Sequence, residues 1–411
     1  MASTLVPDAP VAPPTAPAVQ APPTGLLGTY KRAPALFVSG CGCELVDETG
    51  KIYLDFCAGI ATNALGYADP GLKAAITTAL ESGLIHLSNL YRNAPGERLA
   101  NWLVERSFAS NVFFSNSGAE ANEGAFKFAR KWARSFGPVE KCEIISLRGA
   151  FHGRLGMTLA ATDRAQYRTP FLPLAGGISI AERDLEDLAA TLDPDRVAAV
   201  IVEPIQGEGG VRPMAREFLE GLRALCTERR VALIFDEIQC GLGRTGHFFA
   251  YEWAGVTPDI VTLAKPLAGG LPMGAILVSQ PIAATIAPGD HGTTYGGGPL
   301  VASAAQYVLD RLSDPAMLMH VRETGAWLGA QLRELGTRTG TLREVRGTGF
   351  MWGIDTHEPA AAVVGRAFAH GLLLVGAGEH TIRVIPPLVA DREVLARGLA
   401  LLERALRGAQ S

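Results

Sequence analysis

The sequence has no apolar run long enough to cross a bilayer, and its N-terminus lacks the basic region and continuous hydrophobic stretch of a secretory signal. These absences predict a cytoplasmic protein without a membrane partner. Charge of one sign is also scarce, because 37 basic and 41 acidic residues leave a net charge of only -4 at pH 7. Nucleic acid is therefore not an expected partner either.

Cysteine is rare, with six residues in a chain of 411. Only Cys41 and Cys43 lie close together, and neither a second pair nor nearby histidines complete a zinc site. We therefore expect reduced structural thiols and no bound metal.

The composition changes along the chain. Residues 1–27 consist mainly of Ala, Pro, Val and Thr, which cannot bury a core, so we expect a disordered tail. The remaining length exceeds one ordinary hydrophobic core and predicts a large domain plus a smaller one. The stretch CELVDETGKIYLDF predicts two short strands joined by a turn at residues 48–50. We expect residues 28–70 and 306–411 to form the smaller α+β domain and residues 71–305 the larger one.

Short apolar runs alternate with helical patterns through the expected large domain. They include NVFF, EIISL, VAAVIVE, VALIFDE and DIVTLAK. Some could be buried helix segments, but their brevity and their content of Val and Ile favour strands. The pattern predicts an α/β fold with a mostly parallel, doubly wound sheet. Ligands gather at the carboxyl ends of such strands, so the residues that follow each run are the candidates for chemistry.

The first candidate is SNSGAEAN, which follows the NVFF run. Ser117 and Glu120 have the spacing of a capping box and predict a helix N-terminus, where Gly118 would let a ligand approach the backbone. Such an end binds phosphate through free N–H groups, although an ordinary capped helix has the same features.

The second candidate is FDEIQCGLGRTG, in which Asp236 ends a very apolar strand. A buried carboxylate requires a partner, and both magnesium and a protonated ring nitrogen would serve. Nucleotide-binding strands can end in a similar way, but the pattern G-x-x-x-x-G-K-[ST] that accompanies them is absent.

The third candidate is Lys265, which follows the DIVTLA run and precedes a glycine-rich segment. A buried amine with a lowered pKa is a competent Schiff-base nucleophile. A surface lysine is the alternative for this residue alone. The presence of Asp236 at a neighbouring strand end favours the functional interpretation.

Seven motifs occur in an order that resembles the class III aminotransferases. They are SGAEAN, FHGR, VEPIQGEGG, FDEIQ, GRTG, the lysine in TLAKPLAGGLPMGA, and GTTYGG. The resemblance runs from Tyr30 to the C-terminus and implies the fold type I architecture of enzymes that depend on pyridoxal phosphate (PLP). Each motif alone is weak, whereas seven in order are highly specific.

The resemblance implies roles for the residues around the cofactor. Lys265 matches the lysine that carries PLP as a Schiff base and moves the substrate proton. Asp236 matches the partner of the pyridine nitrogen, which keeps the ring protonated. Gln239 matches the neighbour of the cofactor's phenolic oxygen, and Phe151 matches the aromatic residue stacked on the ring. His152, beside Phe151, is expected to be a core histidine rather than a residue that supports the site.

The phosphate group has its own expected contacts. Ser117 matches a phosphate ligand together with the amides of Gly118 and Ala119. Thr294, in GTTYGG, matches a threonine that reaches the phosphate in the neighbouring subunit. A homodimer with shared active sites is therefore implied.

Four further residues match positions that recognise substrates. Arg383 resembles the arginine that binds the α-carboxylate of glutamate, and Glu208 a switch that pairs with it while the amine substrate is bound. Arg154 resembles the arginine that holds the distant carboxylate of that substrate, and Tyr30 an entrance tyrosine. For an isolated arginine, a surface ion pair would be the usual interpretation.

The implied reaction moves the distal amino group of N-acetylornithine to 2-oxoglutarate, a step in arginine biosynthesis. Ornithine, succinylornithine, succinyldiaminopimelate or another ω-amino acid are alternative donors. Gly298 and Leu155 depart from the family pattern and put fine specificity in doubt. A racemase or aminomutase would not need the switch pair, and a non-catalytic binding protein would not need Lys265 and Asp236 together.

Overall fold

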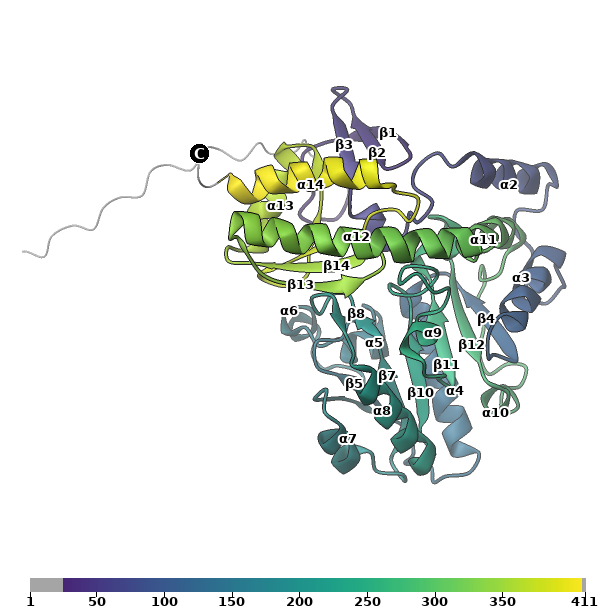
Figure 1. The fold of residues 1–411 in the computed structure, drawn as a ribbon. Helices are drawn as coiled ribbons and strands as arrows, with labels where there is room; N and C mark the ends of the chain where they lie inside the picture. Colours follow the sequence, from purple (N-terminus) through teal and green to yellow (C-terminus); the bar gives the residue numbers. More distant parts are fainter. Residues whose placement is uncertain (1–24, 409–411) are drawn as a thin grey trace, which may run out of the picture.

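The computed structural model describes residues 25–408, so nearly all of the predicted tail over residues 1–27 lies outside the described residues. Figure 1 shows two lobes, with a large sheet and its helices in one and the N- and C-terminal segments in the other. The long helix α12 (Pro315–Thr339) lies where the two lobes meet.

A seven-stranded sheet with the order β4-β12-β11-β10-β7-β5-β6 forms the centre of the larger lobe. Its strands are β4 (Asn111–Ser115), β5 (Glu143–Leu147), β6 (Ile178–Ala181), β7 (Val197–Val202), β10 (Ala232–Asp236), β11 (Ile260–Leu263) and β12 (Gly274–Val278). Neighbouring strands are parallel except where β12 pairs with β11 and β4. The predicted α/β fold is confirmed, and each of the five apolar runs is a strand.

Apolar side chains on both faces explain why this sheet is buried. Along β10, Leu233 and Phe235 belong to one core cluster and Ile234 to another on the opposite face. Helices α7 and α8 contribute to the first cluster, and α4 contributes to the second. Successive strand residues point to opposite faces, so a continuous apolar run requires helices on both sides.

Helices connect these strands and surround the sheet. They are α2 (Pro70–Glu81), α3 (Ala94–Glu105), α4 (Gly118–Arg134), α5 (Gly156–Ala160), α6 (Ala165–Arg168), α7 (Leu185–Thr191), α8 (Arg216–Arg229), α9 (Ala250–Ala254), α10 (Gln280–Ala283) and α11 (Pro299–Leu312). Short 3-10 turns lie at η1 (Thr169–Phe171) and η2 (Lys265–Ala268), and a small hairpin at β8 (Ile205–Gln206) and β9 (Arg212–Pro213). In residues 25–408, no helix is long and apolar enough to span a membrane.

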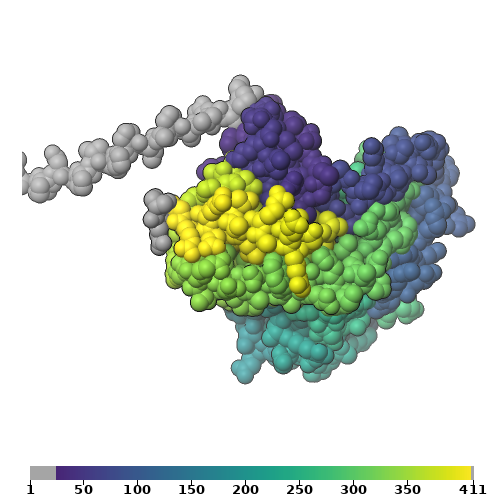
Figure 2. All heavy atoms as spheres, turned by 45° about the horizontal axis from the view of Figure 1, so that its top comes forward, coloured from purple at the N-terminus to yellow at the C-terminus, as the bar shows by residue number. Residues whose placement is uncertain are grey.

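The smaller lobe joins the two ends of the chain. One sheet has the order β1-β2-β3-β15, from β1 (Phe37–Cys41), β2 (Glu44–Asp47), β3 (Ile52–Asp55) and β15 (Leu372–Leu373). The predicted two strands around residues 48–50 are confirmed as β2 and β3, which pair in antiparallel fashion. β15 comes from the C-terminal region and pairs parallel with β3. Figure 2 accordingly shows the two coloured ends of the chain in contact.

The rest of the smaller lobe is C-terminal, apart from a short turn near the pocket. A second sheet has the order β13-β14-β17-β16, from β13 (Leu342–Thr348), β14 (Met351–Thr356), β16 (Val375–Gly376) and β17 (Thr381–Val384). The helices are α1 (Ala58–Ala61), α12, α13 (Ala360–Ala369) and α14 (Arg392–Arg407). The domain boundaries at residues 70 and 305 stay a prediction.

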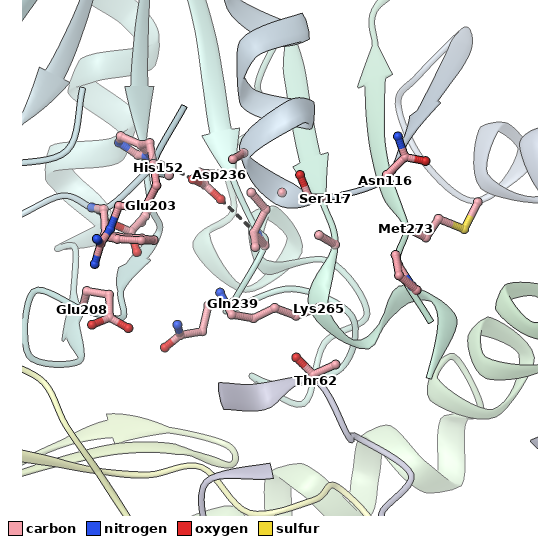
Figure 3. A pocket seen from close by; sticks show the side chains of 18 of the residues that line it. Thr62, Asn116, Ser117, His152, Glu203, Glu208, Asp236, Gln239, Lys265 and Met273 are labelled. Atoms are coloured by element: carbon pink, nitrogen blue, oxygen red, sulfur yellow. Dashed lines mark hydrogen bonds and ion pairs between the residues drawn. The ribbon is translucent and has the colours of Figure 1, made fainter. Parts of the chain in front are cut away.

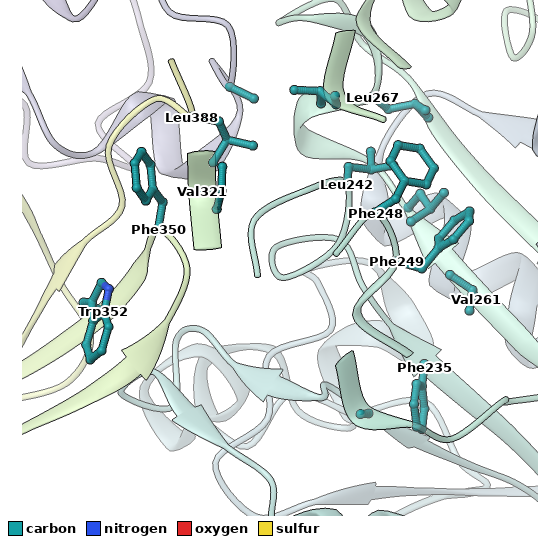
Figure 4. Close-up of a cluster of buried hydrophobic side chains, with 14 of the residues drawn as sticks. Phe235, Leu242, Phe248, Phe249, Val261, Leu267, Val321, Phe350, Trp352 and Leu388 are labelled. Carbon is teal, nitrogen blue, oxygen red and sulfur yellow. The ribbon is translucent and has the colours of Figure 1, made fainter. Parts of the chain in front are cut away.

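One hydrophobic cluster extends through both lobes. Figure 4 shows Leu242 and Phe248 of the larger lobe near Val321, Phe350 and Leu388 of the smaller one. Burial of this shared apolar surface, with atoms packed at the density of a crystal, restrains how the lobes sit against each other. The side chains that the two lobes bring together are therefore held in place by the core.

The close contact between Gly398 of helix α14 and Phe56 of the N-terminal segment leads to a prediction about stability. A Cβ on Gly398 would lie 2.0 Å from Cζ of the fully buried Phe56 ring, whereas a Cβ on Gly365 in α13 would meet nothing within 4 Å. Gly398→Ala should lower the free energy of unfolding by about 1–3 kcal/mol through overpacking. Gly365→Ala, the matched control, should raise it by about 0.5–1 kcal/mol through helix propensity. Urea unfolding measures both, and equal effects would contradict this account of the packing.

Candidate active site

A cavity of about 370 Å³ lies at the carboxyl ends of the central strands. Its walls come from the N-terminus of α4, the segments after β5, β7 and β10, and the turn η2 (Figure 3). The lining residues are Thr62, Asn116, Ser117, Gly118, Ala119, Phe151, His152, Gly153, Arg154, Glu203, Glu208, Asp236, Ile238, Gln239, Ala264, Lys265, Gly270, Leu271, Pro272 and Met273. The structure thus brings together nine of the residues that the sequence singled out.

Asp236 is a buried carboxylate at the end of β10, and each of its oxygens has at least one partner. Oδ2 lies 2.7 Å from Nδ1 of His152 and accepts from Nδ2 of Asn122 at 2.8 Å, while Oδ1 accepts from the Ile238 amide at 3.1 Å. The hydroxyl of Thr262 on β11 donates to Asn122 Oδ1 at 2.7 Å, which fixes the amide. Figure 3 shows the contact between His152 and Asp236. The network holds a negative charge at the pocket wall.

The environment of His152 corrects the expectation of an ordinary core histidine. Its Nδ1 binds Asp236, and its buried Nε2 has no hydrogen-bond partner among the described residues. This contact was not predictable, because nothing in the residues around His152 indicates that the end of β10 lies opposite it. Through this contact, His152 orients Asp236.

Lys265 begins the turn η2, directly beyond β11, and lines the same cavity. Burial lowers the pKa of its amine, although the carboxylates of Asp236 and Glu208 act in the opposite direction. Its backbone φ of +26° lies outside the usual region for a residue with a Cβ. Strained backbone of this kind is found where the surrounding structure fixes a functional side chain.

The N-terminus of α4 faces the pocket. The Ser117 hydroxyl accepts from the Glu120 amide at 3.2 Å, as the capping pattern predicted, but the Glu120 carboxylate reaches back to the Asn116 amide at 2.6 Å. A Cβ on Gly118 would lie 2.7 Å from Cδ1 of Ile238, so a larger residue here would require Ile238 to shift. An α-helix of 17 residues presents its first free amides and the positive end of its dipole here.

A second buried carboxylate, Glu203 at the end of the β7 segment, joins two loops of the pocket. Its Oε1 accepts from the Phe151 amide and its Oε2 from the Gly207 amide, both at 2.9 Å. Burial raises the pKa of Glu203, and the nearby Asp236 adds to the effect. Glu203 was not among the predicted site residues, yet it follows a buried strand as Asp236 does, and the rule that ligands gather at strand ends also points to it.

Glu208 and Arg383 form an ion pair at the pocket, with Oε1 and Nη1 2.6 Å apart. Arg383 lies on β17 of the smaller lobe and is 1% exposed, while Glu208 belongs to the segment between β8 and β9. Nη1 of Arg383 also donates to Oε1 of Gln239 at 3.2 Å. The Nε of Arg383 is buried without a partner among the described residues. The ion pair therefore joins the two lobes and leaves the Nε donor of Arg383 without a hydrogen bond.

Arg154 is an exposed residue of the lining. Its guanidinium carbon lies 3.4 Å from the centre of the Tyr167 ring and 5.8 Å from that of Phe151. No ion pair with a carboxylate joins it within residues 25–408. The positive charge is thus available to a ligand that enters the pocket.

Three expected site residues do not line this cavity: Arg383 reaches it through its ion pair with Glu208, whereas Tyr30 and Thr294 lie apart from it. Tyr30 is 75% exposed and lies beside Arg32, with 5.7 Å between its ring centre and the guanidinium carbon. Thr294 lines a separate surface cavity together with Leu90 and Tyr91. Within a single chain, neither residue contributes to the pocket. No group of three or more His, Cys, Asp or Glu in the described part of the chain is arranged to hold a metal ion.

The residues of the pocket fit pyridoxal phosphate. The amine of Lys265 suits a carbonyl carbon, the buried carboxylate of Asp236 suits a protonated ring nitrogen, and the amides at the start of α4 suit a phosphate group. The three groups line one cavity. This set of donors and acceptors matches the three polar ends of the cofactor.

Comparison with known proteins agrees with this geometry. The family model for class-III aminotransferases matches residues 29–406. An acetylornithine aminotransferase from Gloeobacter violaceus is 46% identical over 381 residues, which cover 92% of this chain and 94% of the relative. A succinylornithine transaminase from Yersinia enterocolitica is 42% identical over 402 residues and covers 94% and 96% of the two chains.

A solved structure is similar as well. The N-acetylornithine aminotransferase from Stenotrophomonas maltophilia is 37% identical, with a TM-score of 0.82 over 93% of this chain and 98% of that one. The family match covers both lobes and every residue of the pocket. The chain therefore belongs to the class-III aminotransferases, the transaminases that depend on pyridoxal phosphate.

Proposed function

We propose that this protein transfers the distal amino group of N-acetylornithine to 2-oxoglutarate, giving N-acetylglutamate 5-semialdehyde and glutamate in arginine biosynthesis. The identity of 46% with an acetylornithine aminotransferase supports the choice of donor. The ion pair between Glu208 and Arg383 is the observation that carries the two-substrate reaction, because it provides a carboxylate site that opens for one substrate and closes for the other.

The chain's own residues divide the work of holding the cofactor. When bound, pyridoxal phosphate supplies a carbonyl carbon that accepts amino groups and a ring that withdraws electrons. Asp236 would hold the ring nitrogen protonated, and His152 and Asn122 orient Asp236 for this task. Phe151 would pack against the ring, and Gln239 would bind its phenolic oxygen.

The phosphate group is assigned to the start of α4. Ser117 and the amides of Gly118 and Ala119 provide its hydrogen-bond donors, aided by the helix dipole. Two backbone amides and the Ser117 hydroxyl would thus hold this end of the cofactor.

Lys265 acts on the substrate proton. Because burial lowers the pKa of its amine, a larger share of the side chain is neutral near pH 7 and able to accept a proton. Nζ then removes the proton from the substrate carbon that bears the amino group and returns it at a different atom. The carboxylates of Asp236 and Glu208 limit how far the pKa falls.

Glu208 and Arg383 decide which substrate enters. With the pair closed, the charge of Arg383 is neutralised and N-acetylornithine binds with its carboxylate at Arg154. When Glu208 moves away, Nη1 of Arg383 would be free to bind the α-carboxylate of glutamate or 2-oxoglutarate. An unpaired buried arginine is costly, so one of the two carboxylates is always required.

N-succinylornithine is the second candidate donor, because a succinylornithine transaminase is 42% identical over 94% of the chain. Both donors share the ornithine carboxylate and differ only in the acyl group. Ornithine, succinyldiaminopimelate and other ω-amino acids are further alternatives, and the departures at Gly298 and Leu155 bear on this choice. Gly298 is the N-cap of α11, and Leu155 is 45% exposed beside Arg154.

A homodimer with shared sites is also proposed. Thr294 lies away from the pocket of its own chain, beside Leu90 and Tyr91, which are 89% and 68% exposed. Contiguous exposed apolar patches mark protein interfaces, and Leu90 and Tyr91 are adjacent candidates for such a patch. Light scattering should give the mass of two 43.4 kDa chains, and a monomer that retains full activity would contradict the role of Thr294. The cytoplasmic location stays a prediction, supported by six free thiols.

The substrate is tested by half-reactions without an acceptor. The cofactor's absorbance band near the visible edge should disappear fastest with N-acetylornithine, more slowly with N-succinylornithine and ornithine, and return on addition of 2-oxoglutarate. Faster reaction with N-succinylornithine would assign the second candidate. A purified protein without this absorbance band would contradict the proposal that it is a pyridoxal-phosphate enzyme. Turnover without an amino acceptor would indicate a racemase or aminomutase.

The switch is tested with Glu208→Ala in the same assay. Removal of the carboxylate leaves Arg383 unpaired, so kcat/KM for N-acetylornithine should fall about tenfold or more, while kcat with glutamate changes little. Glu344→Ala, which removes an exposed carboxylate of another ion pair, is the matched control. An equal loss in both half-reactions would contradict the switch.

The proton-transfer role is tested with Lys265→Ala. Loss of the amine should reduce kcat by about 10³-fold or more, since both covalent binding and proton transfer depend on it. Borohydride reduction should attach the cofactor to the peptide that contains Lys265 in the wild type and not in the variant. Lys73→Ala, on the exposed surface of α2, is the control. Near-normal turnover of Lys265→Ala would disprove the mechanism.

A further inference from the structure

Tyr167 is a half-buried aromatic residue that no motif of the sequence singled out. It lies on the short helix α6, and its ring faces the guanidinium of Arg154, with 3.4 Å between the ring centre and Cζ. Its ring meets that of Phe151 edge to face, with 6.4 Å between centres and 83° between planes. Arg154 thus lies at an aromatic corner formed by Tyr167 and Phe151.

We propose that Tyr167 is a specificity-positioning residue, whose ring holds the guanidinium of Arg154 ready for the carboxylate of the amine substrate. This inference rests on the proposed function, in which Arg154 binds that carboxylate. The ligand class that the corner selects is an ω-amine with a carboxylate at its far end.

The mode of contact explains why an aromatic ring suits this task. A guanidinium is planar and its N–H donors point outward in that plane, so a ring stacked on one face leaves the donors free. A protein carboxylate would also hold the arginine, but it would occupy the donors that the substrate requires. Within residues 25–408, no ion pair engages Arg154.

The exposure of Arg154 makes such support necessary. An exposed arginine samples many rotamers, and ordering it on binding costs side-chain entropy. Stacking on Tyr167 removes part of that freedom before the substrate arrives, which improves affinity through preorganisation.

The position of α6 links the same segment to the switch. Arg164, directly before α6, donates from Nη2 to the backbone carbonyl of Glu208. The Tyr167 amide in turn donates to the Arg164 carbonyl at 2.9 Å. One short segment therefore contacts Arg154 through a ring and, through the backbone, Glu208, the ion-pair partner of Arg383.

The test compares two donors that differ only in the carboxylate, N-acetylornithine and its decarboxylated analogue N-acetylputrescine. Tyr167→Leu removes the aromatic face, and Tyr167→Phe keeps it. Tyr167→Leu should raise the KM for N-acetylornithine about three- to tenfold, with kcat within about twofold. It should leave kcat/KM for the analogue unchanged, and Tyr167→Phe should resemble the wild type with both donors. Tyr167→Met, without a π face, is the second variant if Tyr167→Leu does not fold.

Arg154→Leu separates failure of this inference from failure of the proposed function. If Arg154→Leu leaves the KM for N-acetylornithine unchanged, the assigned role of Arg154 is wrong. If Arg154→Leu raises that KM but Tyr167→Leu does not, only the role of Tyr167 is overturned. An equal loss of kcat/KM for both donors in Tyr167→Leu would show a merely structural residue and would also overturn it. Wild-type protein that rejects N-acetylornithine would refute the proposed function before any variant is compared.

Discussion

The buried carboxylate of Asp236 is the constraint on which the pocket depends. A charge at the end of an apolar strand is tolerated only when its oxygens are satisfied, and the partners come from a loop, a helix and the backbone. Asn122 is itself fixed by Thr262 on the neighbouring strand. The carboxylate thereby ties α4, β11 and the segment after β5 to the end of β10. Those elements carry, or directly precede, the amides at the start of α4, Lys265 and Phe151, all of which line the cavity.

The second organising feature is the contact between the lobes. Arg383 is buried in the smaller lobe, and its charge is neutralised by Glu208 of the larger one at 2.6 Å. Because the hydrophobic cluster extends through both lobes, the arginine cannot withdraw from the pocket when its partner leaves. In the proposed function, a substrate carboxylate then neutralises Arg383. A fixed arginine and a carboxylate that can leave it would let one site accept two substrates.

Much of the architecture was predictable because it depends on local patterns. Short runs rich in Val and Ile gave the strands of the central sheet, and the segment around residues 48–50 gave the β2 and β3 pair. Ser117 was recognisable as a helix cap. The antiparallel strand β12 was not predicted, since its GAILV run directly follows a segment rich in glycine and proline, which is typical of a loop. The pairing of β15 with β3 joins residues more than 300 positions apart and leaves no local signal.

The sequence by itself determined the alternation of strands and helices, the chemistry available at the strand ends, and the motifs that identify the family. Those properties follow from residue type and short spacing. Tertiary structure alone decided that His152 binds Asp236, that Glu203 joins two loops, and that Tyr167 lies beneath Arg154. Such contacts depend on how distant segments pack around a shared core, and packing is a property of the whole fold rather than of any stretch of chain.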